Sequence, residues 1–125
     1  MPTEARMKQA MQAYLDRYNQ DDLEGVVGLY ADDATVEDPV GTPVKAGKAA
    51  IRDFYKFAMT TGARLSLAAP IRASHGRSAA MPFDVTLNYQ GSRMIIRVID
   101  VMTFNDAGQF SSMRAYWGPS DMIKS

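Results

Sequence analysis

The chain contains no cysteine and a single histidine among its 125 residues. Without cysteine there is no disulfide framework, no thiolate nucleophile and no thiolate ligand for a metal. The histidine, His75, lies in the sequence SHGR, which is typical of a turn, and nothing near it in the sequence forms a metal site or a catalytic triad. We therefore expect His75 to be a solvated loop residue and expect no metal site.

The sequence also lacks an excess of either charge. Acidic and basic residues are balanced at 14 each, and no basic stripe indicates a nucleic-acid partner. There is no apolar run long enough to span a membrane and no charged and apolar leader for export. We therefore expect no nucleic-acid partner and no membrane association, and the absence of cysteine fits a reducing cytoplasm.

The spacing of apolar residues predicts three helices in the first half of the chain. Apolar side chains recur at helical intervals in residues 3–19 and again in residues 51–58, where Gly62 can end the helix. A capping box at residues 21–24 predicts a short second helix between them. The buried face of this helix would consist of Leu23, Val26, Val27 and Tyr30.

The second half of the chain changes to an alternating pattern, which is typical of strands. Strand patterns occupy residues 33–39, 64–73, 81–89, 94–104 and 109–117. Pro39 ends the first of them, Pro70 interrupts the second, and the turn sequences YQGSR and NDAG join the last three. We therefore predict a single α+β domain over residues 1–125, in which three N-terminal helices pack on a strongly curved, mainly antiparallel sheet.

The segment MIIRVIDVMTF, residues 94–104, places one acid on an apolar face. Because strand side chains alternate, one face carries Met94, Ile96, Val98, Asp100, Met102 and Phe104. Two interpretations remain open. In the first, the fold brings a partner to Asp100, such as Arg114 or a hydroxyl group. Alternatively, an apolar pocket raises the pKa of Asp100, so that a protonated carboxyl group can donate a hydrogen bond.

Asp38 and three tyrosines are further candidates, each with a purely structural alternative. Asp38 ends a strand in VEDPV, where Asp before Pro is also a common turn element, and Glu37 should point to the opposite face. Tyr14 lies on the buried stripe of the first helix, as a core tyrosine would. Tyr30 and Tyr55 are also predicted to face inward, and one shared hydrogen-bond network would satisfy all three phenols.

The whole chain resembles the bacterial ketosteroid isomerases, or steroid Δ-isomerases, which have a nuclear-transport-factor-like fold. Three blocks carry the resemblance: YADDATVEDP at residues 30–39, RASHGRSAAMPF at residues 72–83, and VIDVMTF at residues 98–104 with the downstream MRAYW. The blocks lie in the family's order and close to its spacing. The resemblance is weaker in the loop after Arg64 and at the C-terminal tail.

The resemblance implies a role for each candidate residue. Asp38 corresponds to the general base, and Tyr14 and a protonated Asp100 correspond to the two donors of an oxyanion hole. The implied substrate-binding residues are Tyr18, Tyr30, Tyr55, Met81, Phe83, Met113, Ala115 and Trp117, of which Tyr30 and Tyr55 also support the oxyanion donor. Tyr18 is bulkier than the aliphatic residue expected at its position, so it would either narrow the cavity or extend the hydroxyl network.

The implied reaction moves the double bond of an unconjugated 3-oxosteroid into conjugation through a dienolate. Asp38 would carry one proton within the substrate while Tyr14 and Asp100 stabilise the oxyanion. No cofactor is needed, because the ketone of the substrate is the electron sink. The resemblance also implies a cone-shaped cavity, a homodimer and a cytoplasmic location.

Two alternatives share the same fold. One is a non-catalytic protein that binds a lipid or a protein partner, although the joint presence of Tyr14, Asp38 and Asp100 argues against it. The other is a different enzyme, such as an epoxide hydrolase, cyclase or dehydratase. The position of His75 in a turn and the lack of a second base near Asp38 make that alternative weaker.

Overall fold

The computed structural model describes residues 2–124 and contains three α-helices there. A polar residue caps the N-terminus of the first two. The helices are α1 (Glu4–Asn19), α2 (Leu23–Val27) and α3 (Lys48–Thr60). The Thr3 side chain accepts a hydrogen bond from the Arg6 backbone N–H at 3.1 Å, and the Asp22 side chain accepts one from Gly25 at 2.9 Å. These caps satisfy donors that have no partner within the helix. The prediction of three N-terminal helices is confirmed.

The short helix α2 ends earlier than the apolar spacing predicted. Val27 is its last residue, and the Leu29 carbonyl already accepts a hydrogen bond from the Phe110 backbone N–H at 2.9 Å. Tyr30 is therefore the first residue of a strand, and its placement on the buried face of the second helix was wrong. Its side chain still points inward, with none of its surface exposed.

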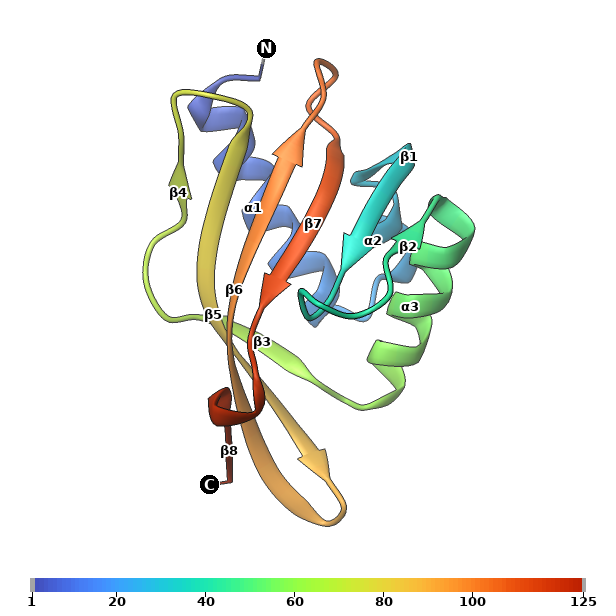
Figure 1. Ribbon diagram of the computed structural model, residues 1–125, viewed down its shortest axis with the longest axis vertical. Helices are drawn as coiled ribbons and strands as arrows, with labels where there is room; N and C mark the ends of the chain where they lie inside the picture. The colour runs from blue at the N-terminus through green and yellow to red at the C-terminus, as the bar shows by residue number, and fades with distance from the viewer. Residues whose placement is uncertain (1, 125) are drawn as a thin grey trace.

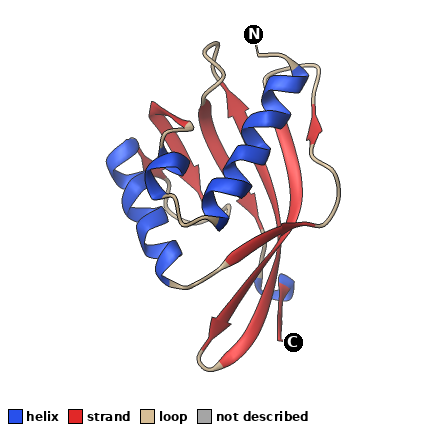
Figure 2. Ribbon diagram, turned by 180° about the vertical axis from the view of Figure 1, so that it is seen from behind, coloured by secondary structure: helices blue, strands red, loops and turns tan. Residues whose placement is uncertain are grey.

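The strands form one eight-stranded sheet, with the order β2-β1-β7-β6-β5-β3 and with β4 beside β5 and β8 beside β6. They are β1 (Tyr30–Glu37), β2 (Lys45–Ala46), β3 (Arg64–Leu67), β4 (Arg72–Ala73), β5 (Ser78–Tyr89), β6 (Ser92–Phe104), β7 (Phe110–Tyr116) and β8 (Met122–Lys124). Figures 1 and 2 show a curved sheet with the three helices on one of its faces. The α+β class is thus confirmed.

The sheet is mixed rather than purely antiparallel. The pair β1 and β7 runs parallel, whereas the other strand pairs within residues 2–124 are antiparallel, so the prediction of a mainly antiparallel sheet is confirmed with one exception. The parallel pair brings the end of β1 beside the end of β7, with Glu37 opposite Arg114. This pairing places the residues that follow the two strands close together.

A long hairpin of β5 and β6 forms the wall of the sheet opposite α3 and extends beyond the helices (Figure 1). Its two-residue turn consists of Gln90 and Gly91, whose φ angles of 51° and 79° are both positive, as a type I′ turn requires. The register sets Phe83 opposite Val98 and Met81 opposite Asp100. Because paired residues share a face, these side chains all point toward the helices.

The hydrophobic core lies between this inner face and the helices. From α1 it contains Met7, Met11, Tyr14, Leu15 and Tyr18. The face of β6 that was predicted to be apolar does point inward: Asp100 is only 1% exposed, whereas Ile99 on the other face is 48% exposed. No helix in the described part of the chain is long and apolar enough to cross a membrane.

Candidate active site

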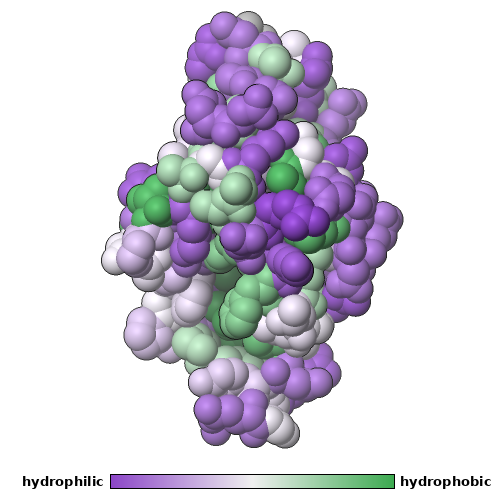
Figure 3. Space-filling model, turned by 90° about the vertical axis from the view of Figure 1, so that its right-hand side faces the viewer, coloured by the Kyte–Doolittle hydropathy of each residue, from purple (hydrophilic) through white to green (hydrophobic). Residues whose placement is uncertain are grey.

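A pocket of about 310 Å³ opens between the helices and the inner face of the sheet. Its lining consists of Tyr14, Tyr18, Asp38, Phe54, Tyr55, Phe57, Ala58, Thr61, Ala63, Leu65, Phe83, Val85, Leu87, Ile96, Val98, Asp100 and Trp117. Figure 3 shows a hollow edged by apolar surface on the side of the molecule that carries α3. Most of the lining is apolar, and the carboxyl and hydroxyl groups within it are therefore poorly solvated.

The Asp100 carboxyl group projects into this pocket from the middle of β6. Neither of its oxygens has a hydrogen-bond partner among residues 2–124. Burial, and then the nearby negative charge of Asp38, raise its pKa well above the usual value for an aspartic acid. Arg114 is not its partner, because that side chain lies 3.4 Å from Glu37 on the other face of the sheet. The structure therefore favours a protonated Asp100 over an ion-paired one.

The raised pKa of Asp100 has a consequence for stability. Below the pKa of the unfolded chain, both states hold the proton, and Asp100 adds no pH dependence. Above it, the unfolded chain releases the proton and the folded protein keeps it, so Asp100 lowers the free energy of unfolding as the pH rises toward its folded pKa. The slope reaches about 1.4 kcal/mol per pH unit for one group.

We expect Asp100→Asn to remove this slope, because an amide of the same shape does not titrate. The measurement is the free energy of unfolding of both proteins by denaturant at a series of pH values above 4. The advantage of the variant should grow with pH. Asp38, whose pKa is also raised, is present in both proteins and contributes a slope of the same sign to each. Parallel profiles for the two proteins would contradict a proton held by Asp100.

Three phenols form a chain of hydrogen bonds that ends at the pocket. The Tyr30 and Tyr55 hydroxyl oxygens lie 2.5 Å apart, and the Tyr55 hydroxyl donates to Tyr14 over 3.0 Å. Because Tyr55 has a single proton and gives it to Tyr14, Tyr30 must be the donor to Tyr55. The Tyr14 hydroxyl therefore accepts a bond from Tyr55 and keeps its own proton free to donate into the pocket. The predicted network of three phenols is confirmed.

Burial keeps these phenols protonated. It is the largest cause that raises the pKa of Tyr14, Tyr30 and Tyr55 well above the ordinary value for a tyrosine. For Tyr14, the charge of Asp100 would raise the pKa further, and the hydrogen bond from Tyr55 opposes the shift. Tyr14 is thus a hydrogen-bond donor rather than a phenolate at neutral pH.

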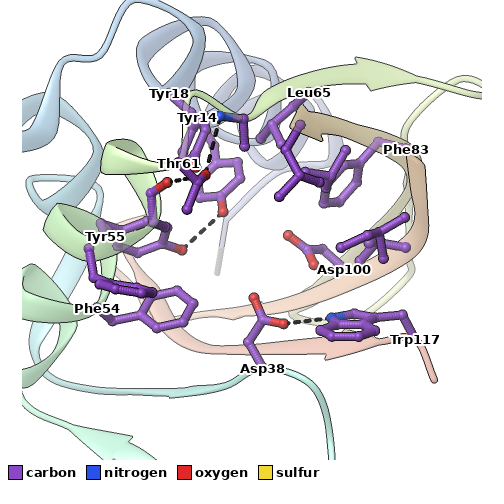
Figure 4. Close-up of a pocket in the computed structure, with 17 residues that line it drawn as sticks. Tyr14, Tyr18, Asp38, Phe54, Tyr55, Thr61, Leu65, Phe83, Asp100 and Trp117 are labelled. Carbon is purple, nitrogen blue, oxygen red and sulfur yellow. Dashed lines mark hydrogen bonds between the residues drawn. The ribbon is translucent and has the colours of Figure 1, made fainter. Parts of the chain in front are cut away.

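Asp38 lies directly after β1 and is held by the residue directly after β7. The indole N–H of Trp117 donates to Asp38 Oδ1 at 2.8 Å. Burial raises the pKa of Asp38, while this hydrogen bond and the charge of Lys45 lower it. Glu37 lies on the opposite face, as predicted, and accepts a hydrogen bond from the Gly41 backbone N–H at 2.8 Å. In Figure 4 the carboxyl groups of Asp38 and Asp100 point toward the same space as the Tyr14 hydroxyl.

The pocket does not contain all of the predicted substrate-binding residues. Tyr18, Tyr55, Phe83 and Trp117 line it together with the three candidate catalytic residues. Four others are absent from its lining and are at most 1% exposed: Tyr30, Met81, Met113 and Ala115. They belong to the hydrophobic core, whose side chains fill the space between the helices and the sheet beside the pocket. A direct contact between them and a substrate stays a prediction.

Ten lining residues were missed in the sequence. They are Phe54, Phe57, Ala58, Thr61, Ala63, Leu65, Val85, Leu87, Ile96 and Val98. The residues of β5 and β6 among them could have been found from the alternating pattern. Val85 and Leu87 share a face with Phe83, and Ile96 and Val98 share a face with Asp100. Phe54 and Ala58 belong to the helical apolar spacing of residues 51–58, but that spacing does not show that the end of this helix packs against a distant hairpin.

The structure offers no competing metal or histidine site within residues 2–124. His75 is exposed in a bend, as predicted, and does not line the pocket. No three His, Cys, Asp or Glu side chains in the same range form a group that could hold a metal ion. The chemistry of the pocket therefore depends on two carboxyl groups, the phenols and an indole.

Comparisons with known proteins agree with this arrangement. Residues 11–113 match the SnoaL-like domain family. The chain is 42% identical over 120 residues to a steroid Delta-isomerase of Nocardioides simplex, and the match covers 95% of each chain. It is also 33% identical over 125 residues to the epoxide hydrolase LasB of Streptomyces lasalocidi, covering 97% of this chain and 44% of that hydrolase.

The solved structures include an equally complete match to a different enzyme of this fold. The epoxide hydrolase/cyclase-like enzyme SalBIII, described for pyran ring formation in the polyether salinomycin, superposes with a TM-score of 0.90 at 27% identity. The match covers 97% of both chains. The fold thus accommodates isomerases as well as epoxide-opening enzymes, and the site residues must decide between them.

Proposed function

Because the chain belongs to the SnoaL-like domain family and is a ketosteroid-isomerase-like member of it, we propose that it is a steroid Δ-isomerase. Its substrate would be an unconjugated 3-oxosteroid, and its product the conjugated ketone. The resemblance to an isomerase along 95% of both chains supports this choice. An apolar pocket with a few polar groups at one end suits a steroid, which is largely apolar and carries its ketone at one edge.

In this proposal Asp38 moves one proton and the ketone accepts one electron pair. The ionised Asp38 takes the proton from C4, the C4–H pair forms a bond to C3, and the carbonyl pair moves to oxygen to give a dienolate. The oxyanion pair then restores the carbonyl, the pair of the C3–C4 double bond becomes the C4–C5 double bond, and the pair of the former C5–C6 double bond takes the proton from Asp38 at C6. Atoms and electrons balance within the substrate, so the reaction requires no cofactor.

Tyr14 and protonated Asp100 would stabilise the dienolate oxygen by donating hydrogen bonds. The observation that carries the proposal is the Asp100 carboxyl group, which is buried without a partner among residues 2–124 on the wall that faces Asp38. A buried carboxyl group without a partner lowers the stability of the fold, and groups of this kind are concentrated at functional sites. An ionised Asp100 would repel the developing negative charge, whereas a neutral one donates to it.

A spectroscopic assay tests this function directly. An unconjugated 3-oxosteroid is mixed with the protein, and the ultraviolet absorbance of the conjugated enone is followed against a reaction without protein. A steady rise in absorbance, proportional to protein concentration, is the expected result. Properly folded protein that gives no rise above the uncatalysed rate would remove the isomerase proposal and favour a binding protein or another enzyme.

Epoxide opening is the second candidate, and it is favoured by the relatives of this fold and by the same pair of acids. A protonated Asp100 could donate to an epoxide oxygen while ionised Asp38 activates a nucleophile. The identity of this chain to LasB and to SalBIII is lower than its identity to the isomerase, so this candidate is second. Conversion of a steroid epoxide by the protein, without enone formation from the oxosteroid, would reverse this order.

The proposed enzyme is a homodimer, as the resemblance implies. The outer face of the sheet offers a surface for a second copy, because Ile99 and Tyr116 are paired across β6 and β7 and are 48% and 43% exposed. Sedimentation of the purified protein would test this point. The cone shape of the cavity and the cytoplasmic location also stay predictions of the resemblance.

A further inference from the structure

Tyr18 is a pocket phenol that takes no part in the hydrogen-bond network. It lines the pocket, yet it is only 4% exposed. Its hydroxyl group has no hydrogen-bond partner among residues 2–124. Its ring packs on those of Tyr14 and Tyr55, with centroid distances of 6.5 Å and 6.4 Å. Tyr18 therefore does not extend the hydroxyl network, although its ring supports the two phenols that belong to it.

The other polar groups of the lining already have a partner or a role in the proposed reaction. The Thr61 hydroxyl donates to the Ala58 carbonyl at 2.6 Å and accepts from the Ala63 backbone N–H at 3.3 Å. The acids, Tyr14, Tyr55 and Trp117 form the reacting end described above. Among the lining residues, this leaves the Tyr18 hydroxyl as a donor without an assignment. The Tyr18 hydroxyl is open to the pocket, because the only fully enclosed side-chain polar atoms without a partner in residues 2–124 are the two Asp100 oxygens. A ligand that displaces water from the pocket must therefore supply a hydrogen bond to Tyr18 or leave this donor unpaired.

The Tyr18 hydroxyl is a donor at neutral pH. Burial raises its pKa to about 12, and the charge of Arg64 opposes that shift. A neutral phenol donates to a carbonyl oxygen, or both donates to and accepts from a hydroxyl group. Because the lining is mostly apolar, a charged ligand group would lose its hydration there, and the group that matches Tyr18 is an uncharged oxygen.

The position of Tyr18 places this oxygen away from the reacting ketone. Tyr14 and Tyr18 lie one turn apart on the same face of α1, which corresponds to a rise of about 6 Å along the helix. Both side chains line the same wall of the pocket (Figure 4). A ketone oxygen held by Tyr14 and Asp100 already has two donors, so Tyr18 is left for a second oxygen of the same ligand.

We propose that Tyr18 forms a second polar subsite, which binds a hydroxyl or carbonyl oxygen of the steroid other than the ketone at C3. This inference rests on the proposed function and narrows its substrate class to 3-oxosteroids that carry a further oxygen. The subsite would select between ligands, because a pocket with a buried donor discriminates against the analogue that leaves the donor unpaired. Tyr18 is thus a specificity-determining residue and takes no part in proton transfer.

The test compares the binding of matched steroids to wild type and Tyr18→Phe. The probes are a saturated 3-oxosteroid, which cannot be isomerised, and its derivatives with one hydroxyl group at C6, C7, C11 or C17. Binding is followed by the fluorescence of Trp117, the single tryptophan of the chain, which lines the pocket. Tyr89→Phe is the matched control, because Tyr89 is 49% exposed and lies outside the pocket lining.

We expect wild type and Tyr89→Phe to bind at least one hydroxylated probe about fivefold more tightly than the parent steroid, the size of one neutral hydrogen bond. Tyr18→Phe should lose this preference. A preference that persists in Tyr18→Phe, or a wild type that binds the parent and prefers no derivative, would overturn the subsite and leave the isomerase proposal standing. If wild type binds none of the probes, the steroid function itself fails, and the subsite fails with it.

Discussion

Asp38→Asn is expected to lower isomerase turnover by roughly 10³-fold, because the amide cannot accept the proton from C4. The side chain keeps its shape, and its oxygen can still accept the hydrogen bond from the Trp117 indole, which spans 2.8 Å in the structure. Folding and steroid affinity should therefore be preserved. The measurements are the rate of enone formation and the affinity for a saturated 3-oxosteroid in the same preparation.

Asp33→Asn is the matched control for this variant. Asp33 lies on the same strand, β1, but its side chain is exposed and does not line the pocket. It should retain wild-type turnover. Turnover close to that of wild type in a folded Asp38→Asn protein would exclude Asp38 as the base and would leave the pocket without an ionised acceptor for the proton.

Tyr14→Phe is expected to lower turnover by about 10²-fold, the usual effect of removing one donor to an oxyanion. The Tyr14 proton is free because its oxygen accepts the hydrogen bond from Tyr55 over 3.0 Å. The substitution removes that donor and leaves the Tyr55 hydroxyl without its acceptor. Single-turnover rates and unfolding free energies, measured on the same protein, separate the loss of catalysis from the loss of stability.

Tyr30→Phe is the comparison that makes the Tyr14 result specific. Tyr30 is fully buried, is absent from the pocket lining and reaches the site only through its bond to Tyr55. Without the Tyr30 hydroxyl, the hydrogen bond from Tyr55 to Tyr14 loses the polarisation that Tyr30 supplies, and turnover should fall less than tenfold. Equal catalytic losses for the two variants, at equal stability, would mean that the direct donor has been misassigned.

The burial of Asp100 could be predicted from the local sequence pattern, but the absence of Arg114 as its partner could not. The period of two along residues 94–104 put this acid on an apolar face, and the structure buries it there without a partner among residues 2–124. The same pattern could not exclude Arg114 as a partner. Arg114 is excluded by the pairing of β6 with β7, which sets it opposite Val101 on the outer side, beside Glu37.

The end of the second helix and the parallel pairing of β1 with β7 could not be predicted from the local sequence pattern. The spacing of Tyr30 continued a helical stripe, but pairing with Phe110, far along the chain, drew it into β1. That parallel pair also brings Asp38 to Trp117, a contact between residues 79 positions apart. Such contacts depend on the order of strands in the sheet, which hydrophobic period does not encode.

The mouth of the pocket was missed for a related reason. Phe57 is 73% exposed and reads as a surface residue of α3, yet it lines the pocket with Leu87 from the far hairpin. Exposure of a single large apolar side chain is common and indicates little by itself. Only the curvature of β5 and β6 toward α3 turns these residues into one wall.

The central claim is that Asp100 is protonated when it meets the dienolate oxygen. Infrared spectroscopy of the complex with a steroid whose ring A is phenolic, a mimic of the dienolate, tests it most directly. The account predicts a carbonyl band of a protonated carboxyl group at neutral pH that is present in wild type and absent in Asp100→Asn. The carboxylate bands of an ionised Asp100 in that complex at neutral pH would contradict the account.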